Sequence, residues 1–376
     1  MYINFWHALE LATNVTDKPL KVEVLGQPLV LFRDSKGQPH ALSNTCTHRG
    51  GSLAGGKVNG DCVACPYHGW EFNGDGQCTK IPSLGREGKI PPRTRIDAYP
   101  VQERCGLIFA FLGDLPEAER PPLQAIPEEG QEGWRYTVHT WDVACNYERG
   151  VENAMDPAHN EFVHPTHGFS GERDDYKTPD IELTRTDWGA GFMATFFAPS
   201  LPDPKMKHLK PEIGTMRAGS GHHGPNAMWT YIHFTETNML HQYLWETPID
   251  ATHTRVFLIN YRNHLLDPAL DAKIGERNMV VASQDVAVLE AIEPTITPND
   301  MTHENMTVAD KAIVAYREAL KGWDAKGWRI DSQAVVRNKG RVAYAIPSPG
   351  RRNHKSWALD AVPLVTGAQS AQAAAE

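Results

Sequence analysis

The first third of the chain consists of short apolar runs that end at glycine, aspartate or asparagine. Clear examples are Val22–Leu25, Leu29–Phe32 and Trp70–Phe72. Runs of that length between turn-forming residues are typical of strands joined by hairpins. Cys105–Leu112 adds one more apolar run with the length of a buried strand. Together these runs predict a small all-β unit between residues 20 and 111.

The pattern changes after residue 134. Tyr147–Val163 carries charged and apolar residues at helical spacing and predicts a helix that breaks near Pro157, because proline disrupts a helix interior. Ala269–Ile292 repeats its apolar residues at three- and four-residue steps and predicts one long helix. Aromatic-rich segments predict further strands: Phe192–Phe197, Met228–Phe234, Leu240–Glu246 and Arg255–Tyr261. The second part of the chain therefore combines strands with helices.

Three segments show neither helical spacing nor the short apolar runs of strands. The proline-rich Pro116–Pro127 predicts a linker, and Ser200–Asn226, rich in proline, glycine and histidine, predicts a mobile loop. The last ten residues, 367–376, are small and polar and predict a disordered tail. These boundaries predict a first domain over residues 1–120 and a second domain over residues 121–366.

Composition narrows the class of protein. A length of 376 residues fits two packed domains, and 41% hydrophobic with 22% charged residues is ordinary for a soluble globular chain. A net charge of −9 argues against binding to nucleic acid or an anionic membrane. No run approaches the ~18 apolar residues of a membrane span, and the first residues lack the features of a signal peptide. We therefore expect a cytoplasmic protein.

Four of the six cysteines lie between residues 46 and 78, with two histidines among them. Cys46 and His48 form one pair, and Cys65 and His68 form a second. Two thiolates and two imidazoles are the ligands of a Rieske [2Fe–2S] cluster, in which the cysteines hold one iron and the histidines the other. Neutral imidazoles leave less negative charge on their iron than thiolates would, so the cluster accepts an electron at a higher potential.

A zinc site is the alternative for the same residue types, because Cys62 and Cys65 form a C-x-x-C pair. Zinc sites usually take two cysteines from one loop, whereas each segment here carries one cysteine and one histidine. Cys62 also lies in an apolar, strand-like run, which favours a structural role. We expect structural roles for the three remaining cysteines as well: Cys78, Cys105 and Cys145.

A second candidate site lies in the predicted broken helix. His159 and His164 are five residues apart, and both rings can reach one site if the helix loosens after Pro157. Two histidines and one carboxylate form the facial triad of non-haem Fe(II) oxygenases. Without a carboxylate, the two histidines could equally be exposed residues of an ordinary helix that bind no metal. The best candidate for the carboxylate is Asp285, which has apolar neighbours in the long helix; Glu290 and Glu293 compete with it.

These motifs together resemble those of the aromatic ring-hydroxylating Rieske oxygenases. The resemblance rests on Cys-x-His, sixteen residues, then Cys-x-x-His, and on the stretch ENAMDPAHNEFVH at residues 152–164. It covers nearly the whole chain and implies an α+β fold: an all-β Rieske domain followed by a helix-grip catalytic domain, an antiparallel sheet with helices. It also implies that Asp285 is the third ligand. No cysteine follows His48 or His68 where cytochrome-type Rieske proteins place a disulfide.

The resemblance implies roles for two further residues. Asp156 would hydrogen-bond an iron-ligating histidine and, across a subunit boundary, a cluster histidine, so that electrons pass from His68 of one subunit through Asp156 to His159 of the next. The alternative is a helix N-cap before Pro157. Asn153 would help to position oxygen near the iron. The alternative is that Asn153 is an ordinary turn residue without a catalytic role.

The function that the resemblance implies is a terminal oxygenase with one [2Fe–2S] cluster and one mononuclear Fe(II) per chain. It would use O2 and electrons from a separate NAD(P)H-dependent reductase, directly or through a ferredoxin, to hydroxylate or oxidatively demethylate an apolar, aromatic small molecule. Ring cis-dihydroxylation is the alternative, and a homotrimer is expected. A Rieske electron carrier without oxygenase activity is the alternative from a different class, disfavoured by the second metal motif.

Overall fold

The computed structural model of the protein describes residues 1–199, 214–298 and 300–365. The predicted tail and residues 200–213 of the predicted loop lie outside these ranges. The contacts within the chain divide it into two compact units. The first contains Met1–Leu123, Thr247–Ala251 and the described residues from Trp323 onward. The second contains Gln124–Glu246 and Thr252–Gly322.

The first unit is built mainly from short antiparallel strands, as predicted. They form three sheets with the orders β1-β11-β10, β2-β3-β4-β9 and β5-β6-β7-β8. The strands are β1 Phe5–Leu11, β2 Leu20–Val24, β3 Gln27–Arg33, β4 Pro39–Ser43, β5 Lys57–Asn59, β6 Cys62–Ala64, β7 Glu71–Asn73, β8 Cys78–Lys80, β9 Ala98–Tyr99, β10 Val101–Arg104 and β11 Leu107–Leu112. Single 3-10 turns lie between or after them: η1 Ala12–Asn14, η2 Leu53–Gly55, η3 Pro82–Leu84 and η4 Glu117–Glu119.

Strand β3 shows how the sequence pattern positions the first site. Its side chains alternate between two cores, because successive residues of a strand point to opposite faces. Leu29 and Leu31 pack into one core, and Val30 and Phe32 pack into the other. The second core contains two of the predicted cluster ligands, Cys46 and Cys65. The continuous apolar run in β3 is thus explained by burial on both faces.

The C-terminal segment also belongs to the first unit, which differs from the predicted domain over residues 121–366. Its elements are α5 Ser332–Arg337, β20 Tyr344–Ala345, α6 Gly350–Asn353 and β21 Asp360–Ala361. The fully buried carboxylate of Asp97 accepts hydrogen bonds from Arg351 at 2.7 and 2.8 Å and from the Ser348 hydroxyl at 2.8 Å. These bonds join residues about 250 positions apart, a pairing without a local signal in the sequence.

The second unit contains an eight-stranded sheet, with β12-β19-β18-β17-β16-β14-β13 in order and β15 beside β16. Its strands are β12 Arg135–Val143, β13 Thr184–Thr186, β14 Gly189–Gly191, β15 Ala194–Ala198, β16 Gly214–His223, β17 Ala227–His233, β18 Met239–Pro248 and β19 Thr254–Arg262. Its helices are α1 Tyr147–Met155, α2 Asn160–Val163, α3 Asp271–Leu289 and α4 Lys311–Ala325, the last of which runs past residue 322. Single 3-10 turns are η5 Pro165–His167, η7 Pro268–Leu270, η8 Met301–His303 and η9 Val308–Asp310.

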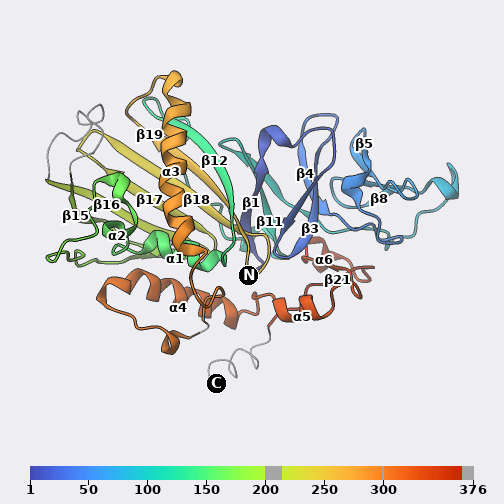
Figure 1. Ribbon diagram of the computed structural model, residues 1–376. Helices are drawn as coiled ribbons and strands as arrows, with labels where there is room; N and C mark the ends of the chain where they lie inside the picture. The colour runs from blue at the N-terminus through green and yellow to red at the C-terminus, as the bar shows by residue number, and fades with distance from the viewer. Residues whose placement is uncertain (200–213, 299, 366–376) are drawn as a thin grey trace. The chain divides into compact units, whose positions relative to one another are not determined.

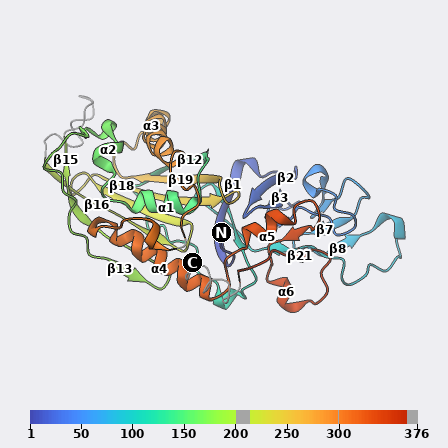
Figure 2. The same cartoon turned by 60° about the horizontal axis from the view of Figure 1, so that its bottom comes forward.

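Helix α3 lies along one face of this sheet, and α4 runs beside α1 (Figures 1 and 2). Alternate residues of β17 and β18 point to the face that α3 covers, among them Thr230 and Gln242, which line a cavity. The residues between them point to the opposite face of the sheet: Tyr231, His241 and Tyr243. On that face the carboxylate of Glu128 accepts a hydrogen bond from the hydroxyl of Tyr243 at 2.6 Å. The sheet thus has one face for the cavity and a separate polar, aromatic face.

One prediction for the second unit needs correction, and two of its elements were missed. The segment from Gly214 to His223, predicted as part of a loop, is strand β16, because its backbone pairs with β15 and β17 on either side. β12 and α4 were not predicted, and β12 pairs with β19 over all nine of its residues. The α+β fold class and the break of the first helix near Pro157 are confirmed. Among the described residues, no helix combines the length and the apolarity that a membrane crossing requires.

Candidate functional site

The two loops with the predicted cluster ligands share one backbone turn. The N–H of Gly50 donates to the carbonyl of Cys46, and the N–H of Gly69 donates to the carbonyl of Cys65, both at 2.9 Å. Each glycine has a positive φ, +73° and +70°, which side chains with a Cβ rarely adopt. A glycine four residues after each cysteine therefore lets the chain turn back tightly around that cysteine.

The loops separate the thiols from the imidazoles. Cys46 and Cys65 are buried, whereas His48 and His68 are exposed, with ring centroids 4.4 Å apart. Burial, together with the neighbouring Cys65, raises the pKa of the Cys46 thiol to about 12, so the thiolate form needs a nearby cation. A Cβ on Gly51 would lie 2.9 Å from the sulfur of Cys65, so glycine keeps room beside it. This donor set fits a cluster with an inner thiolate side and an outer imidazole side.

The zinc alternative finds little support in the geometry. Within the described ranges, three or more potential ligand atoms come within 4.8 Å of one another only at His159, His164 and Asp285. The four loop ligands do not gather as closely as one ion would require. The sulfur of Cys62 lies 3.4 Å from the hydroxyl of Thr79 on the neighbouring hairpin.

The second site depends on the break between α1 and α2. His159 precedes α2 and His164 follows it, where the backbone leaves the helical region with φ −114° and ψ 68°. The short helix brings the Nε2 atoms of the two rings to 3.2 Å. An Oδ1 atom of Asp285 lies 3.3 Å from Nε2 of His164 and 3.7 Å from Nε2 of His159. The structure thus brings together three groups, of which the first and the last, His159 and Asp285, are 126 residues apart in the sequence.

Hydrogen bonds set the tautomers of both histidines. Nδ1 of His159 lies 2.8 Å from the backbone carbonyl of Asp156, and Nδ1 of His164 lies 3.0 Å from the amide oxygen of Gln284. Carbonyl oxygens only accept hydrogen bonds, so each Nδ1 carries a proton, and in the neutral imidazole that binds a metal each Nε2 then has the lone pair. Both lone pairs face Asp285, and this donor set fits a divalent metal ion. Sequence reasoning missed the role of Gln284.

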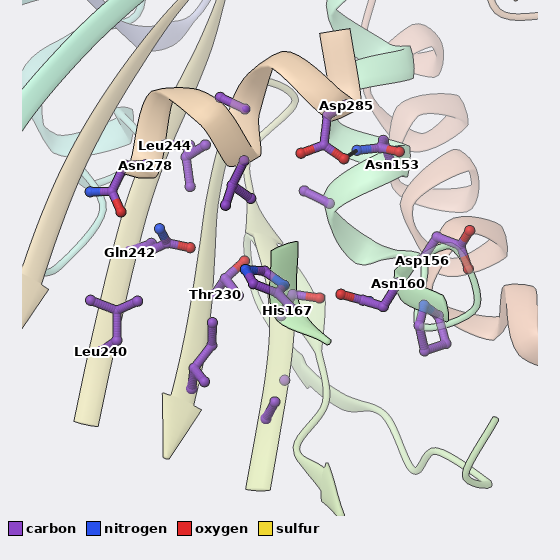
Figure 3. A pocket seen from close by; sticks show the side chains of 18 of the residues that line it. Asn153, Asp156, Asn160, His167, Thr230, Leu240, Gln242, Leu244, Asn278 and Asp285 are labelled. Carbon is purple, nitrogen blue, oxygen red and sulfur yellow. Dashed lines mark hydrogen bonds between the residues drawn. The ribbon is translucent and has the colours of Figure 1, made fainter. Parts of the chain in front are cut away.

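Asn153 supports the carboxylate. Its side-chain N–H donates to Oδ1 of Asp285 at 3.1 Å (Figure 3). Burial acts to raise the pKa of Asp285, but hydrogen bonds and the charges of His164 and His159 bring it below its ordinary value. Glu290, the competing ligand candidate, instead accepts the backbone N–H of Ala144 at 3.0 Å. The structure therefore groups Asp285 and not Glu290 with the histidines.

Asp156 contributes to the site mainly through the backbone. It ends α1, and its carboxylate accepts the N–H of Ala158 at 2.7 Å, while its other oxygen lies 3.9 Å from Nδ1 of His159. The expected N-cap position before α2 is occupied by His159 instead. Within one chain Asp156 closes a turn and its carbonyl orients His159; the role across a subunit boundary stays a prediction.

A cavity of about 340 Å³ opens beside Asp285, between α3 and strands β16 to β19. Most of its wall is apolar, with side chains such as Phe192, Ile232, Leu240, Leu244, Leu258 and Val281. Polar side chains enter it at a few points: Asn160, His167, Thr230, Gln242 and Asn278 (Figure 3). Burial lowers the pKa of His167 to about 4, so this ring is neutral. Sequence reasoning did not single out these polar residues, although alternation along β17 and β18 marks which side chains share a face.

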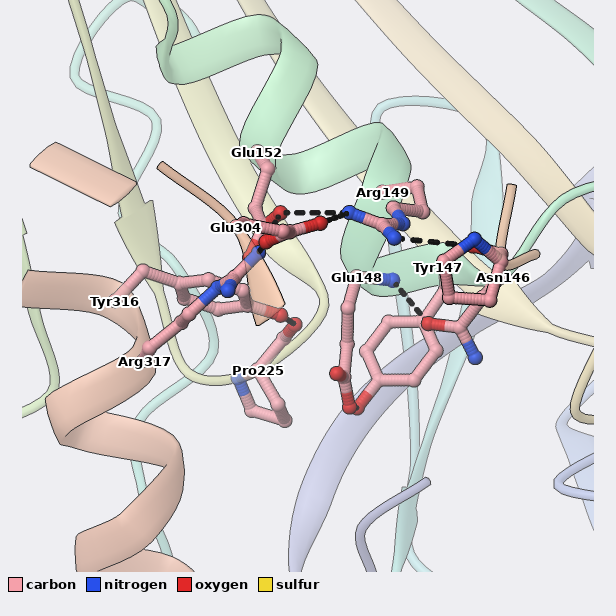
Figure 4. A network of polar contacts seen from close by, with 10 residues as sticks. Asn146, Tyr147, Glu148, Arg149, Glu152, Pro225, Glu304, Tyr316 and Arg317 are labelled. Atoms are coloured by element: carbon pink, nitrogen blue, oxygen red, sulfur yellow. Dashed lines mark hydrogen bonds and ion pairs between the residues drawn. The ribbon is translucent and has the colours of Figure 1, made fainter. Parts of the chain in front are cut away.

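A buried group of charges holds α1 in place (Figure 4). Arg317 on α4 donates to both oxygens of Glu152 at 2.6 and 2.8 Å and forms an ion pair with Glu304 at 2.6 Å. Arg149 donates to the second oxygen of Glu304 at 2.7 Å. Two arginines and two glutamates balance in charge, so the group is stable only while all four are present. Since Glu152 precedes Asn153, the group also fixes the helix that carries Asn153.

Comparison with known proteins covers most of the chain. Residues 5–100 match the model of the Rieske [2Fe–2S] domain. Residues 143–326 match the model of the vanillate O-demethylase oxygenase C-terminal domain. The first match contains both cluster loops, and the second contains the whole histidine and aspartate group.

Individual relatives agree with these matches. The chain is 28% identical over 361 residues to the 5,5'-dehydrodivanillate O-demethylase oxygenase subunit of Sphingobium sp. (strain NBRC 103272 / SYK-6), covering 92% of this chain and 81% of the relative. It is 30% identical over 338 residues to the chloroplastic chlorophyllide a oxygenase of Chlamydomonas reinhardtii, covering 87% of this chain and 49% of that longer protein. Dicamba monooxygenase bound to 3,6-dichlorosalicylic acid superposes with a TM-score of 0.73 at 25% identity, covering 86% of this chain and 98% of that one.

Proposed function

The chain belongs to the Rieske non-haem iron oxygenases, and we propose that it is the terminal oxygenase of a system that hydroxylates or oxidatively demethylates an apolar, aromatic small molecule. The observation that carries the proposal is the group of His159, His164 and Asp285 at the wall of a mostly apolar cavity. Three protein ligands leave coordination positions open, as oxygen chemistry at a non-haem iron requires.

We assign the ligands as follows. The chain carries a Rieske [2Fe–2S] domain, in which Cys46 and Cys65 would hold one iron and His48 and His68 the other. His159, His164 and Asp285 would hold one mononuclear Fe(II). Iron bound there supplies the centre at which O2 is reduced.

The residues of the chain bind, orient and exclude water around this centre. The carbonyls of Asp156 and Gln284 keep both imidazoles in the tautomer that leaves Nε2 free. Asn153 engages Oδ1 of Asp285 and limits its rotation. The apolar wall removes water from an aromatic ring and holds it beside the ligands. For demethylation the balance is R–OCH3 + O2 + 2e⁻ + 2H⁺ → R–OH + HCHO + H2O, with electrons from the reductase.

Electrons would come from a separate NAD(P)H-dependent reductase, directly or through a ferredoxin. The exposed imidazoles of His48 and His68 form the accessible edge of the cluster site, which suits exchange with another protein. We also propose a head-to-tail homotrimer in which His68 of one subunit reaches Asp156 of the next. A cytoplasmic location stays a prediction.

The relatives favour demethylation or monooxygenation over ring cis-dihydroxylation. The matched C-terminal model is that of a vanillate O-demethylase oxygenase, and two of the relatives compared are named as a demethylase and a monooxygenase. A Rieske electron carrier would need only the cluster site, and would not need the group of His159, His164 and Asp285 or the cavity beside it.

The test has two parts. Iron analysis of the anaerobically reconstituted protein should find three irons per chain, whereas an electron carrier would hold two. Incubation with a reductase, NADH, labelled oxygen gas and a panel of methoxylated and unsubstituted aromatic compounds should then give labelled hydroxylated product or formaldehyde. Two irons per chain and no oxygen consumption with any compound would overturn the proposal.

A further inference from the structure

Arg277 enters the cavity from α3 at some distance from the metal ligands. It lies eight residues before Asp285 on the same helix, which corresponds to about 12 Å along the helix axis. Both side chains line the cavity. The cavity thus has a metal-binding end at Asp285 and a cationic side chain two turns away.

The guanidinium of Arg277 lacks a counter-ion in the part of the chain that the structure describes. Its one hydrogen bond there is a long one, 3.5 Å to the backbone carbonyl of Thr166. Arg262, which lines the same cavity, pairs with Asp271 and donates to the carbonyl of Leu265. A half-buried guanidinium in an apolar wall gains most from a charged acceptor, so Arg277 is suited to an anion from outside the chain.

The adjacent side chain supplies a second donor. The side chain of Asn278 also lines the cavity (Figure 3), and its amide nitrogen is buried and makes no hydrogen bond within the described residues. A buried donor without an acceptor is unfavourable, and native structures retain few of them. Arg277 therefore has a neighbour on the cavity wall whose amide donor lacks an acceptor within the described residues and could reach a ligand after a change of side-chain rotamer.

The carboxylates of the cavity already have other roles. Asp285 belongs to the metal ligands, and Asp156 caps its own turn. Glu246 lies against α1, where a Cβ on Gly150 would come within 2.7 Å of its Oε2. Among the described residues, none of the three forms an ion pair with Arg277.

We propose that the substrate is an aromatic compound with an anionic group, a carboxylate or a sulfonate, that Arg277 binds with the help of Asn278. The inference deepens the proposed function and rests on it for the reaction. The ring then lies against the apolar wall between Arg277 and Asp285. Its far end reaches the metal site, so the reacting position lies opposite the anion and not next to it.

Equilibrium binding tests the proposal independently of turnover. The probes are matched pairs of an acid and its neutral methyl ester: 4-methoxybenzoate, 3-methoxybenzoate and 6-methoxy-2-naphthoate. Isothermal titration calorimetry on the iron-loaded protein should show that at least one acid binds about 10–100-fold more tightly than its ester. Arg277→Gln should remove this preference, and Arg277→Lys should retain most of it, because the charge is kept.

Lys273→Gln is the matched control. Lys273 is exposed on α3 four residues before Arg277 and does not line the cavity, so the variant changes the net charge equally and should keep the preference. Asn278→Leu should weaken acid binding by a smaller factor. Iron content and the cluster spectrum verify that each variant is folded.

The outcomes separate the two proposals. Equal binding of acids and esters, no binding of any acid in the panel, or an unchanged preference in Arg277→Gln overturns the anion site. A preference that depends on Arg277, without oxygen consumption or product from any acid, supports the anion site and counts against the proposed reaction. Oxygenated product from the esters but not the acids contradicts the anion site and leaves the reaction standing.

Discussion

The two ligand groups of this chain are built in different ways. The predicted cluster ligands come from two loops of one unit, with all four from Cys46 to His68, and each loop is closed by a local turn at a glycine. The mononuclear site joins a broken helix to Asp285, more than 120 residues further along, and its geometry depends on Gln284 and on the charges around Arg317. A site made from local loops depends on the ligands themselves, whereas a site made across the fold depends also on what holds its parts together.

The largest expected effect is the loss of the cluster. His48→Ala should abolish the visible absorption and the EPR signal of the Rieske cluster, because one iron loses half of its imidazole ligands. Iron at the second site should remain, since its ligands belong to the other unit. The measurement is iron and sulfide content together with the EPR spectrum. A purified variant with an unchanged spectrum would falsify the cluster assignment.

Loss of a ligand at the mononuclear site should remove its iron completely without affecting the cluster. Asp285→Ala should remove the mononuclear iron and all oxygenase activity, yet leave the cluster spectrum intact, because the carboxylate is the only acid in the ligand group. Glu290→Ala is the matched control from the end of the same helix and should keep both iron and activity. Iron loss in Glu290→Ala with full occupancy in Asp285→Ala would reverse the choice of ligand.

The buried charges around Arg317 support only the mononuclear site, so a change there should affect one site and not the other. Arg317→Gln removes the two close hydrogen bonds to Glu152 and leaves Glu304 with Arg149 alone, and breaking a buried ion pair in this way costs about 3–5 kcal/mol. We expect this loss in the free energy of unfolding, measured by chemical denaturation with circular dichroism, together with weaker binding of the mononuclear iron. The cluster should be unaffected.

The control for that variant lies on the same helix. Glu318 pairs with Arg185 at 3.1 Å, with both side chains more than half exposed. Exposed ion pairs contribute little, so Glu318→Gln should leave stability and iron content nearly unchanged. Equal effects of Arg317→Gln and Glu318→Gln would mean that burial of the charges does not support the site.

The smallest effect should be kinetic. Asp156→Asn keeps the backbone carbonyl that orients His159 and much of the turn that closes on Ala158, but removes the charge. We expect both metals to stay bound and electron transfer from the reduced cluster to the mononuclear iron to slow by about 10–100-fold, the usual range for groups that support metal ligands. Stopped-flow reoxidation of the cluster with oxygen and substrate measures this step. An unchanged rate would leave Asp156 with a structural role alone.

Periodicity and motif spacing were sufficient for the strands of residues 1–123 and for much of the second unit, but not for the C-terminal segment that completes the first unit. Hairpin strands, the break at Pro157 and the position of α3 follow from local preferences that the fold does not overrule. The segment from Gly214 to His223 shows where this fails. Its glycines and histidines have low strand propensity, yet β15 and β17 satisfy its backbone on both sides, and that pairing decides its conformation.

For the cluster loops the sequence by itself was enough to predict the ligands, because cysteine, histidine and glycine stand at fixed steps within one short stretch. Only the tertiary structure decided which carboxylate joins the two histidines, that Gln284 orients one of them, and that Arg317 steadies α1. It alone also places Arg277 and Asn278 in the cavity. Each of these contacts joins residues more than a hundred positions apart or places a side chain on a particular wall. Such positions depend on how sheet and helices pack. Periodicity shows which face of an element is buried, but it does not show which distant residue that face meets.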